Sequence, residues 1–156
     1  MKIKVVLDTS YLLPFFGLRV KELSDEMITQ LIIVFKKIEV FYPILMIPEL
    51  IAKISKELIR RKIRINESII GAFESLLSKV DIQLIEPQVN HIVKAIEIRT
   101  RGHRDIFDCI AYATALEENA KLLTMDIEFI QFLEANEYDT SIIWDHNKLL
   151  KEITSK

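Results

Sequence analysis

The sequence predicts an α/β protein, a three-layer α/β/α sandwich around a central parallel sheet of four to five strands. Two observations lead to this prediction. Short apolar stretches alternate with helical stretches along the whole chain, the pattern of parallel strands joined by helices. Only 3 glycines and 4 prolines occur in 156 residues, which predicts short loops and a large helical fraction.

The first third of the chain should contain two strands and one helix. Residues 3–7 are almost wholly apolar and are the first expected strand, of the kind buried within a parallel sheet. A helix over residues 25–37 follows Ser24, whose hydroxyl suits the position before a first helical turn. Residues 40–42 are the second expected strand, which Pro43 ends.

The middle of the chain should be mostly helical. Helices are expected over residues 48–61, 67–77 and 87–100, with the third strand over residues 81–85 between the last two. Asn66 is a favourable cap for the second of these helices. Pro87 suits the first turn of the third helix, and Gly102 marks its end.

The last third continues the alternation. An alanine-rich helix, a strand, a short helix, a strand and a closing helix are expected over residues 105–119, 121–124, 127–135, 142–144 and 147–153. Neither a repeat nor a low-complexity linker interrupts the pattern. Residues 1–156 are therefore predicted to form a single domain.

Composition limits the class of protein. The chain is 50% hydrophobic and 28% charged, as in ordinary globular proteins, and its net charge of -2 argues against a protein that coats nucleic acid by bulk electrostatics. A single cysteine, Cys109, cannot form an internal disulfide, which fits a reducing compartment. No apolar run approaches the ~20 residues needed to cross a bilayer, so we expect a cytoplasmic protein without a membrane association.

Acidic residues stand where a parallel sheet places its ligand sites. Asp8 follows the first strand, Asp126 lies just beyond the fourth, and Asp108 begins a helix of small residues. Because ligands bind outside the carboxyl ends of such strands, these acids and Glu49 should converge on one point. Each acid alone has an ordinary interpretation as a helix cap or a surface group. Together they predict a Mg²⁺ or Mn²⁺ site, as in a small metal-dependent phosphodiester hydrolase.

At these residues the chain resembles the PIN-domain family, the fold of many toxin ribonucleases of the VapC type. The family pattern is matched by Asp8-Thr9-Ser10 after a hydrophobic strand, by Glu49 on a helix, and by Asp108 before small residues. Thr124-Met125-Asp126 after the following strand completes it. The likeness spans nearly the whole chain in order, and the block from Asp108 to Asp126 is its most specific part.

The resemblance implies a metal-dependent ribonuclease with RNA as its usual substrate and Mg²⁺ or Mn²⁺ bound by the acids. We expect Asp8 and Asp108 to be the main ligands, with Asp126 a third, directly or through water. Glu49 would hold a water on the metal or a second ion. The hydroxyls expected to support these acids or to contact a phosphate belong to Thr9, Ser10 and Thr124.

Other polar residues near the motifs keep two interpretations. Asp105 precedes Asp108 by three residues and is either a further ligand or the cap of its helix. His103 is expected to face solvent, with contact to a phosphate as the alternative. The basic residues Arg99, Arg101 and Arg104 lead into the site and are expected to bind RNA. A second basic cluster, from Lys53 to Arg64, is either a phosphate-binding rim or a solvated helix face.

The residues bear differently on three alternatives to a toxin nuclease. A phosphatase of the haloacid-dehalogenase type needs a second Asp two residues after the first, where this chain has Ser10. A catalytically inactive PIN scaffold would have little reason to keep four mutually repelling carboxylates. A stand-alone RNA-processing nuclease stays open, since residues 44–80 make the chain longer than a minimal toxin.

The resemblance also implies protein partners, because toxins of this family usually form homodimers and are silenced by an antitoxin. The apolar stretch of residues 11–16 is either a surface for such contacts or part of the core.

Overall fold

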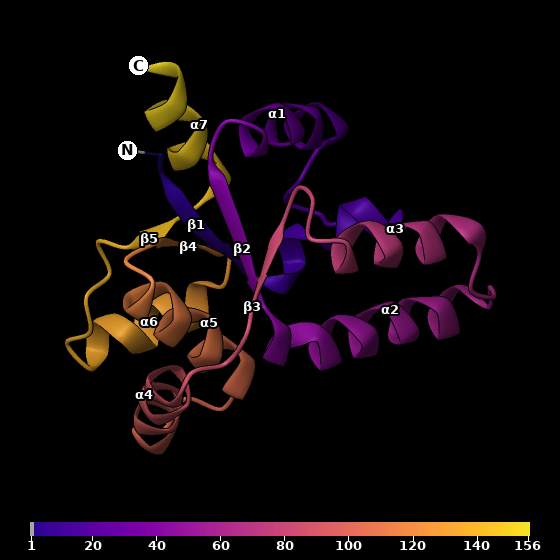
Figure 1. The fold of residues 1–156 in the computed structure, drawn as a ribbon. Coiled ribbons are helices and arrows are strands. Elements are labelled where there is room, and N and C mark those ends of the chain that lie inside the picture. The colour runs from indigo at the N-terminus through magenta and orange to yellow at the C-terminus, as the bar shows by residue number, and fades with distance from the viewer. Residues whose placement is uncertain (1) are drawn as a thin grey trace.

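A five-stranded sheet, all of its strands parallel, forms the centre of the computed structural model, which describes residues 2–156 (Figure 1). Met1, the first residue of the predicted domain, lies outside the described residues. The strands are β1 (Lys4–Leu7), β2 (Glu39–Pro43), β3 (Gln83–Ile85), β4 (Lys121–Leu123) and β5 (Ile143–Trp144). Their spatial order is β3-β2-β1-β4-β5, which confirms the predicted fold class.

The central strand β1 joins the two halves of the sheet. Val5 lies opposite Val40 of β2, and Val6 lies opposite Leu122 of β4. From β1 the chain builds the sheet first toward β3, then returns to the other side of β1 for β4 and β5. The order therefore reverses between β1 and β4, and ligands of open α/β sheets bind outside the carboxyl ends of strands at such a reversal.

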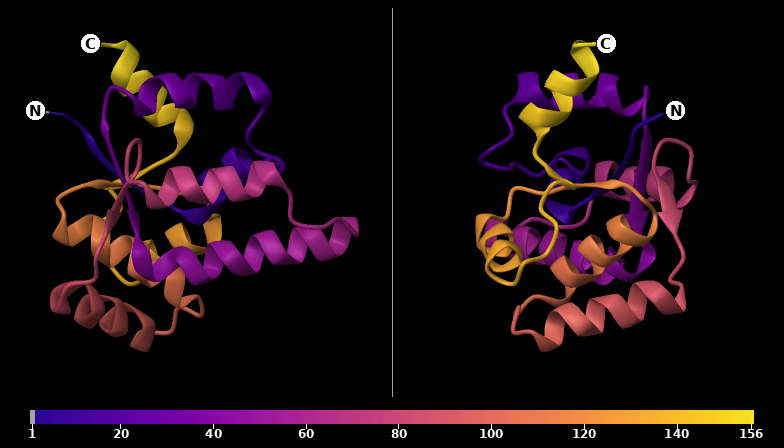
Figure 2. Two further views of the ribbon diagram at one scale, coloured as in Figure 1. Left: turned by 45° about the vertical axis from the view of Figure 1, so that its right-hand side comes forward. Right: turned by 90° about the vertical axis from the view of Figure 1, so that its left-hand side faces the viewer.

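Helices cover both faces of this sheet. Within residues 2–156 they are α1 (Asp25–Phe35), α2 (Ile47–Arg61), α3 (Glu67–Leu77), α4 (Val89–Thr100), α5 (Ile106–Glu117), α6 (Ile127–Ala135) and α7 (His146–Thr154). Figure 2 shows α1 and α7 on one side of the sheet and α4, α5 and α6 on the other, while α2 and α3 extend outward. No helix of residues 2–156 is long and apolar enough to span a membrane.

Local signals explain where most of these helices begin. The Ser24 hydroxyl accepts a hydrogen bond from Met27 N–H at 3.2 Å, and the Asn66 amide oxygen accepts one from Ile69 N–H at 3.0 Å. Both caps were expected from the residue types. The helix expected from Pro87 instead begins at Val89, because Gln88 has an extended backbone and serves as its cap.

Residues 9–16 form two short 3₁₀ helices, η1 (Thr9–Tyr11) and η2 (Leu13–Phe16), which the hydrophobic pattern did not predict. A third, η3 (Ile44–Met46), leads into α2. Tyr11, Leu12 and Phe16 are buried in the core, which settles most of this stretch as core and not as a surface for partners.

Helix α5 packs directly on the sheet, and small side chains along the helix allow this close packing. Ala111, Ala113 and Ala115 are all buried, and α5 contacts both β1 and β4. Helix α4 covers the outer side of α5. Asp108, in the first turn of α5, is thereby carried close to the carboxyl ends of β1 and β4.

This close approach makes a prediction about packing. Ala113→Leu should lower the free energy of unfolding by about 1–3 kcal/mol, because added methylenes in a packed interface force backbone shifts. Chemical denaturation would measure the change. Ala135→Leu, at the exposed end of α6, is the control and should stay within about 0.5 kcal/mol of the unaltered chain. Equal effects of the two substitutions would contradict the packing argument.

Candidate active site

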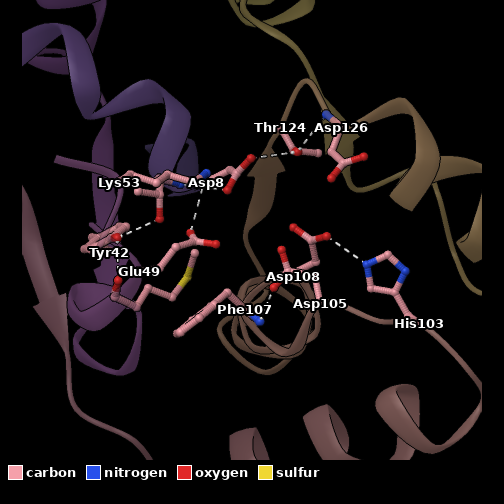
Figure 3. A network of polar contacts seen from close by, with 12 residues as sticks. Asp8, Tyr42, Glu49, Lys53, His103, Asp105, Phe107, Asp108, Thr124 and Asp126 are labelled. Atoms are coloured by element: carbon pink, nitrogen blue, oxygen red, sulfur yellow. Dashed lines mark hydrogen bonds and ion pairs between the residues drawn. The ribbon is translucent and has the colours of Figure 1, made fainter. Parts of the chain in front are cut away.

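The ends of β1 and β4 place two acids and a threonine next to one another. Asp8 N–H donates to the Leu123 carbonyl at 2.9 Å, so the pairing of the strands continues into the site. The Thr124 hydroxyl donates to Asp8 Oδ2 at 3.2 Å and accepts from Asp126 N–H at 3.2 Å. Thr124 thus connects the two acids that follow neighbouring strands (Figure 3).

Asp8 is held rigidly and is only 7% exposed. Its Oδ1 accepts a hydrogen bond from Thr9 N–H at 2.7 Å, and Thr124 holds the other oxygen. Burial raises the pKa of the Asp8 carboxyl, because the charged form loses its hydration. The Lys53 ammonium and the two hydrogen bonds oppose that rise.

The two acids at the start of α5 play different structural parts. Asp105 is the N-cap, and its Oδ1 accepts from Phe107 N–H at 2.9 Å. Asp108 lies in the first turn and is only 6% exposed. Burial raises the pKa of Asp108 to about 9, and the charges of Asp105, Asp8, Asp126 and Glu49 act in the same direction. At neutral pH, Asp108 therefore keeps its proton unless a cation compensates the charge.

Glu49 approaches the same place from the first turn of α2. It is buried, and its Oε1 has no hydrogen-bond partner among residues 2–156. The nearest compensating charge is the Lys53 ammonium, 4.0 Å from that oxygen. Burial raises the pKa of Glu49 as well. An unpaired buried carboxylate oxygen is costly, and a bound cation would compensate it.

Figure 3 shows the five acids, Asp8, Glu49, Asp105, Asp108 and Asp126, arranged around one space. Within residues 2–156, no group of three or more His, Cys, Asp or Glu side chains is arranged so that it could hold a metal ion. The donors nevertheless fit Mg²⁺ or Mn²⁺, which prefer oxygen ligands. Mg²⁺ commonly keeps several waters and is held through only one or two carboxylates, so such a site does not need three protein ligands.

The hydroxyls predicted to support the acids occupy three different environments. The Thr9 hydroxyl is buried and lies 2.8 Å from the Tyr42 hydroxyl, which itself donates to the Met46 carbonyl at 3.0 Å. Thr9 therefore ties the site to β2. Thr124 bonds to Asp8 and to Asp126, and Ser10, which follows Thr9 in the chain, is half-buried.

The expectation for His103 was wrong. The side chain is buried, and its Nε2 lies 2.7 Å from Asp108 Oδ2. Its ring packs against Phe129 and Phe132, with centroid distances of 4.6 and 4.9 Å. The loop before α5 folds back over that helix, which brings His103 onto Asp108. In the sequence, only the five-residue spacing between His103 and Asp108 could have indicated this contact. That signal is weak, because spacing within a loop does not determine where a side chain points.

The three arginines predicted to bind RNA lie in three different places. Arg104 lines an open groove of about 610 Å³, together with Lys53 and Lys56 of α2, and Glu49 and Asp105 border the same groove. Arg101 instead lies over the Tyr138 ring, 5.7 Å from its centroid. Arg99 is exposed on the last turn of α4.

Farther along α2 the basic residues lose contact with the groove. Arg60 and Arg61 pair with Glu57, at 2.7 and 3.5 Å. Of the second basic cluster, from Lys53 to Arg64, only Lys53 and Lys56 therefore face the groove. The rest is a solvated helix face.

A comparison with family models identifies the fold. The model of the PIN domain matches residues 5–133, a range that contains all four motif acids and most of the chain. This chain belongs to the PIN domain family. Its resemblance to the family, inferred from the motifs, is thereby confirmed. No sequence among curated proteins matches the chain significantly.

Solved structures share the fold at low sequence identity. VapBC2 from Rickettsia felis, bound to a DNA fragment of its promoter, has a TM-score of 0.60 at 16% identity over 92% of this chain and 98% of that one. A toxin-antitoxin complex from Klebsiella pneumoniae has a TM-score of 0.60 at 12% identity over 91% and 97%. PAE2754 from Pyrobaculum aerophilum has a TM-score of 0.60 at 18% identity over 99% and 91%.

The raised pKa of Asp108 predicts a stability that depends on pH. Between the ordinary pKa of 3.8 and the value of about 9 in the folded chain, the folded state keeps a proton that the unfolded state releases. Stability therefore falls as pH rises, by at most about 1.4 kcal/mol per pH unit from this group. Asp108→Asn removes this loss and can still donate to His103. In EDTA, Asp108→Asn should be more stable than the unaltered chain, increasingly so from pH 5 to pH 8.

Thermal unfolding at the two pH values measures this difference. Asp25→Asn, on the exposed first turn of α1, is the control and should show no comparable trend. A stability difference for Asp108→Asn that stays constant with pH would contradict the assigned burial of this carboxyl.

Proposed function

We propose that this PIN domain is a metal-dependent endoribonuclease that hydrolyses RNA phosphodiester bonds. The observation that carries the proposal is the convergence of buried acids at the carboxyl ends of β1 and β4, where Glu49 Oε1 has no hydrogen-bond partner within residues 2–156. PIN domains are typically nucleases, which supports the same function. The roles below follow from the positions and chemistry of the side chains.

Asp8 and Asp108 are the proposed principal ligands of Mg²⁺ or Mn²⁺, since both are buried and face the shared space. Asp126 is a third, directly or through water, and Glu49 binds a water or a second ion. When bound, the metal would supply positive charge and an activated water for attack on phosphorus. Asp105 supports the site chiefly as the cap of α5, because one of its oxygens is already used there.

The groove beside the acids is the proposed path for single-stranded RNA. Lys53, Lys56 and Arg104 supply positive charge along it, and Ile106 and Phe107 contribute apolar surface. Phosphate contacts by lysine and arginine position a nucleic acid, while apolar surface accommodates bases. The local charge of the groove compensates for the slightly negative charge of the whole chain.

For the biological role, we propose the toxin of a type II toxin-antitoxin pair, acting as a homodimer and silenced by an antitoxin protein. The two toxin-antitoxin complexes with the same fold support this role. A stand-alone RNA-processing nuclease and an inactive scaffold are the alternatives.

The nuclease proposal is tested with purified protein and a mixed pool of single-stranded RNA, in Mn²⁺, Mg²⁺ or EDTA. Cleavage should require the metal, and Asp8→Asn should lower its rate by at least about 100-fold, since even partners of metal ligands cost 10–100-fold. Asp25→Asn is the control and should cleave normally. Cleavage in EDTA, or full activity of Asp8→Asn, would contradict the proposed site, and no cleavage in either metal would favour the scaffold.

The groove makes a separate prediction about binding. In an Asp8→Asn background with EDTA, Lys56→Ala with Arg104→Ala should weaken RNA binding. The two lost phosphate contacts should also make the slope of log affinity against log salt shallower by about 1.4. Fluorescence anisotropy over a salt series measures both quantities.

The matched control is Lys36→Ala with Lys37→Ala, which removes the same charge at the end of α1. If the control changed the slope as much as the groove variant, binding would reflect net charge and not the groove.

A further inference from the structure

We propose that His103 is a positioning residue for Asp108: its Nε2 holds one carboxylate oxygen and leaves the other free to bind the metal ion. This inference rests on the proposed metal-dependent function and deepens it. It assigns a role to a residue that the motif acids do not include. Three observations support it: the hydrogen bond, the packing that fixes the imidazole ring, and the direction of the second Asp108 oxygen.

The hydrogen bond joins two buried side chains. His103 Nε2 lies 2.7 Å from Asp108 Oδ2, and both residues are less than a tenth exposed. An ionised carboxylate can only accept hydrogen bonds, so Nε2 carries the hydrogen whenever Asp108 binds a cation. Bonds to an ionised acceptor are short and strong, which makes this one an effective constraint on the carboxylate.

The imidazole ring is fixed by its surroundings. Phe129 and Phe132 of α6 pack against it and stack on each other, with their centroids 6.5 Å apart. Gly102 precedes His103 with φ of +116°, a conformation that side chains rarely adopt, and this turn directs the loop back over α5. Helix α6, which begins after Asp126, thus holds the residue that orients Asp108 of α5.

The second carboxylate oxygen of Asp108 faces the other acids. Figure 3 shows the hydrogen bond to His103 on one oxygen, while the second points into the space shared with Asp8 and Glu49. Residues that orient a metal ligand in this way typically contribute 10–100-fold to metal affinity. Loss of the His103 hydrogen bond should therefore be visible as weaker metal binding, without any measurement of catalysis.

The experiment compares Mn²⁺ affinity of the unaltered chain and four variants by isothermal titration calorimetry, with thermal unfolding in EDTA as a check on folding. His103→Phe keeps an aromatic ring against Phe129 and Phe132 but removes the donor. His103→Gln loses the ring but can place an amide N–H near the position of Nε2. His103→Asn is also an amide donor, yet it is too short to reach that position.

The expected result is a Kd for Mn²⁺ raised about 10–100-fold in His103→Phe and in His103→Asn, with most of the affinity recovered in His103→Gln. A residue that served only to pack against the two phenylalanines would give the reverse order, because His103→Phe would then be the mildest change. The comparison of Gln with Asn decides the matter even if the phenylalanine variant folds poorly.

His91→Phe is the matched control. His91 is also buried, and its Nε2 lies 3.1 Å from a carboxylate oxygen of Glu118, at the far end of α5 from the acids. Its replacement should leave the Mn²⁺ affinity unchanged. If it weakened binding as much as His103→Phe, the effect would be one of general stability, and the inference would be overturned.

Two failures are distinguishable. If the unaltered chain binds no Mn²⁺, both the proposed metal-dependent function and the role of His103 are overturned. If the unaltered chain binds Mn²⁺ and His103→Phe binds it equally well, only the role of His103 is overturned.

Discussion

The pairing of β1 with β4 is the constraint on which the rest of the site depends. Their parallel register places the ends of both strands at one edge of the sheet, and the hydrogen bond from Asp8 N–H to the Leu123 carbonyl extends that register by one residue. Thr124 can then bond to Asp8 and to Asp126 together. The small side chains of α5 bring Asp108 within reach, and η3 and α2 bring Glu49. These four acids are far apart in the chain. They lie near one another because the central strand β1 pairs with both β2 and β4.

Burying these acids together lowers the stability of the folded chain. Burial and mutual repulsion raise the pKa values of Asp8, Glu49 and Asp108, so the folded chain resists full ionisation of its own site. A fold that needed only stability would not bury these carboxylates together, and a cation would remove much of the conflict. Because a cation would offset this electrostatic cost, the site should favour binding of Mg²⁺ or Mn²⁺. Lys53, near both Asp8 and Glu49, supplies a smaller compensating charge from within the chain.

Much of the fold was predictable because its signals are local. Ser24 and Asn66 cap helices through their own side chains, and residues 127–135 form a helix with the expected bounds. The convergence of acids was predictable too, since parallel strands end at a common edge and each acid follows a strand or opens a helix. The 3₁₀ helices of residues 9–16 were not predictable from hydrophobic period, because short turns of this kind carry no repeating pattern.

The sequence by itself determined the α/β class, the order of strands and helices, and which acids follow a strand or open a helix, because these depend on hydrophobic period and on neighbouring residues. Only the tertiary structure decided how the loop before α5 uses its polar residues. His103 turns inward onto Asp108, Arg104 turns to the groove, and Arg101 lies over Tyr138. These directions are set by contacts with α2, α6 and the segment after α6, which are distant in the chain. A loop without a repeating pattern takes its conformation from the surfaces that surround it.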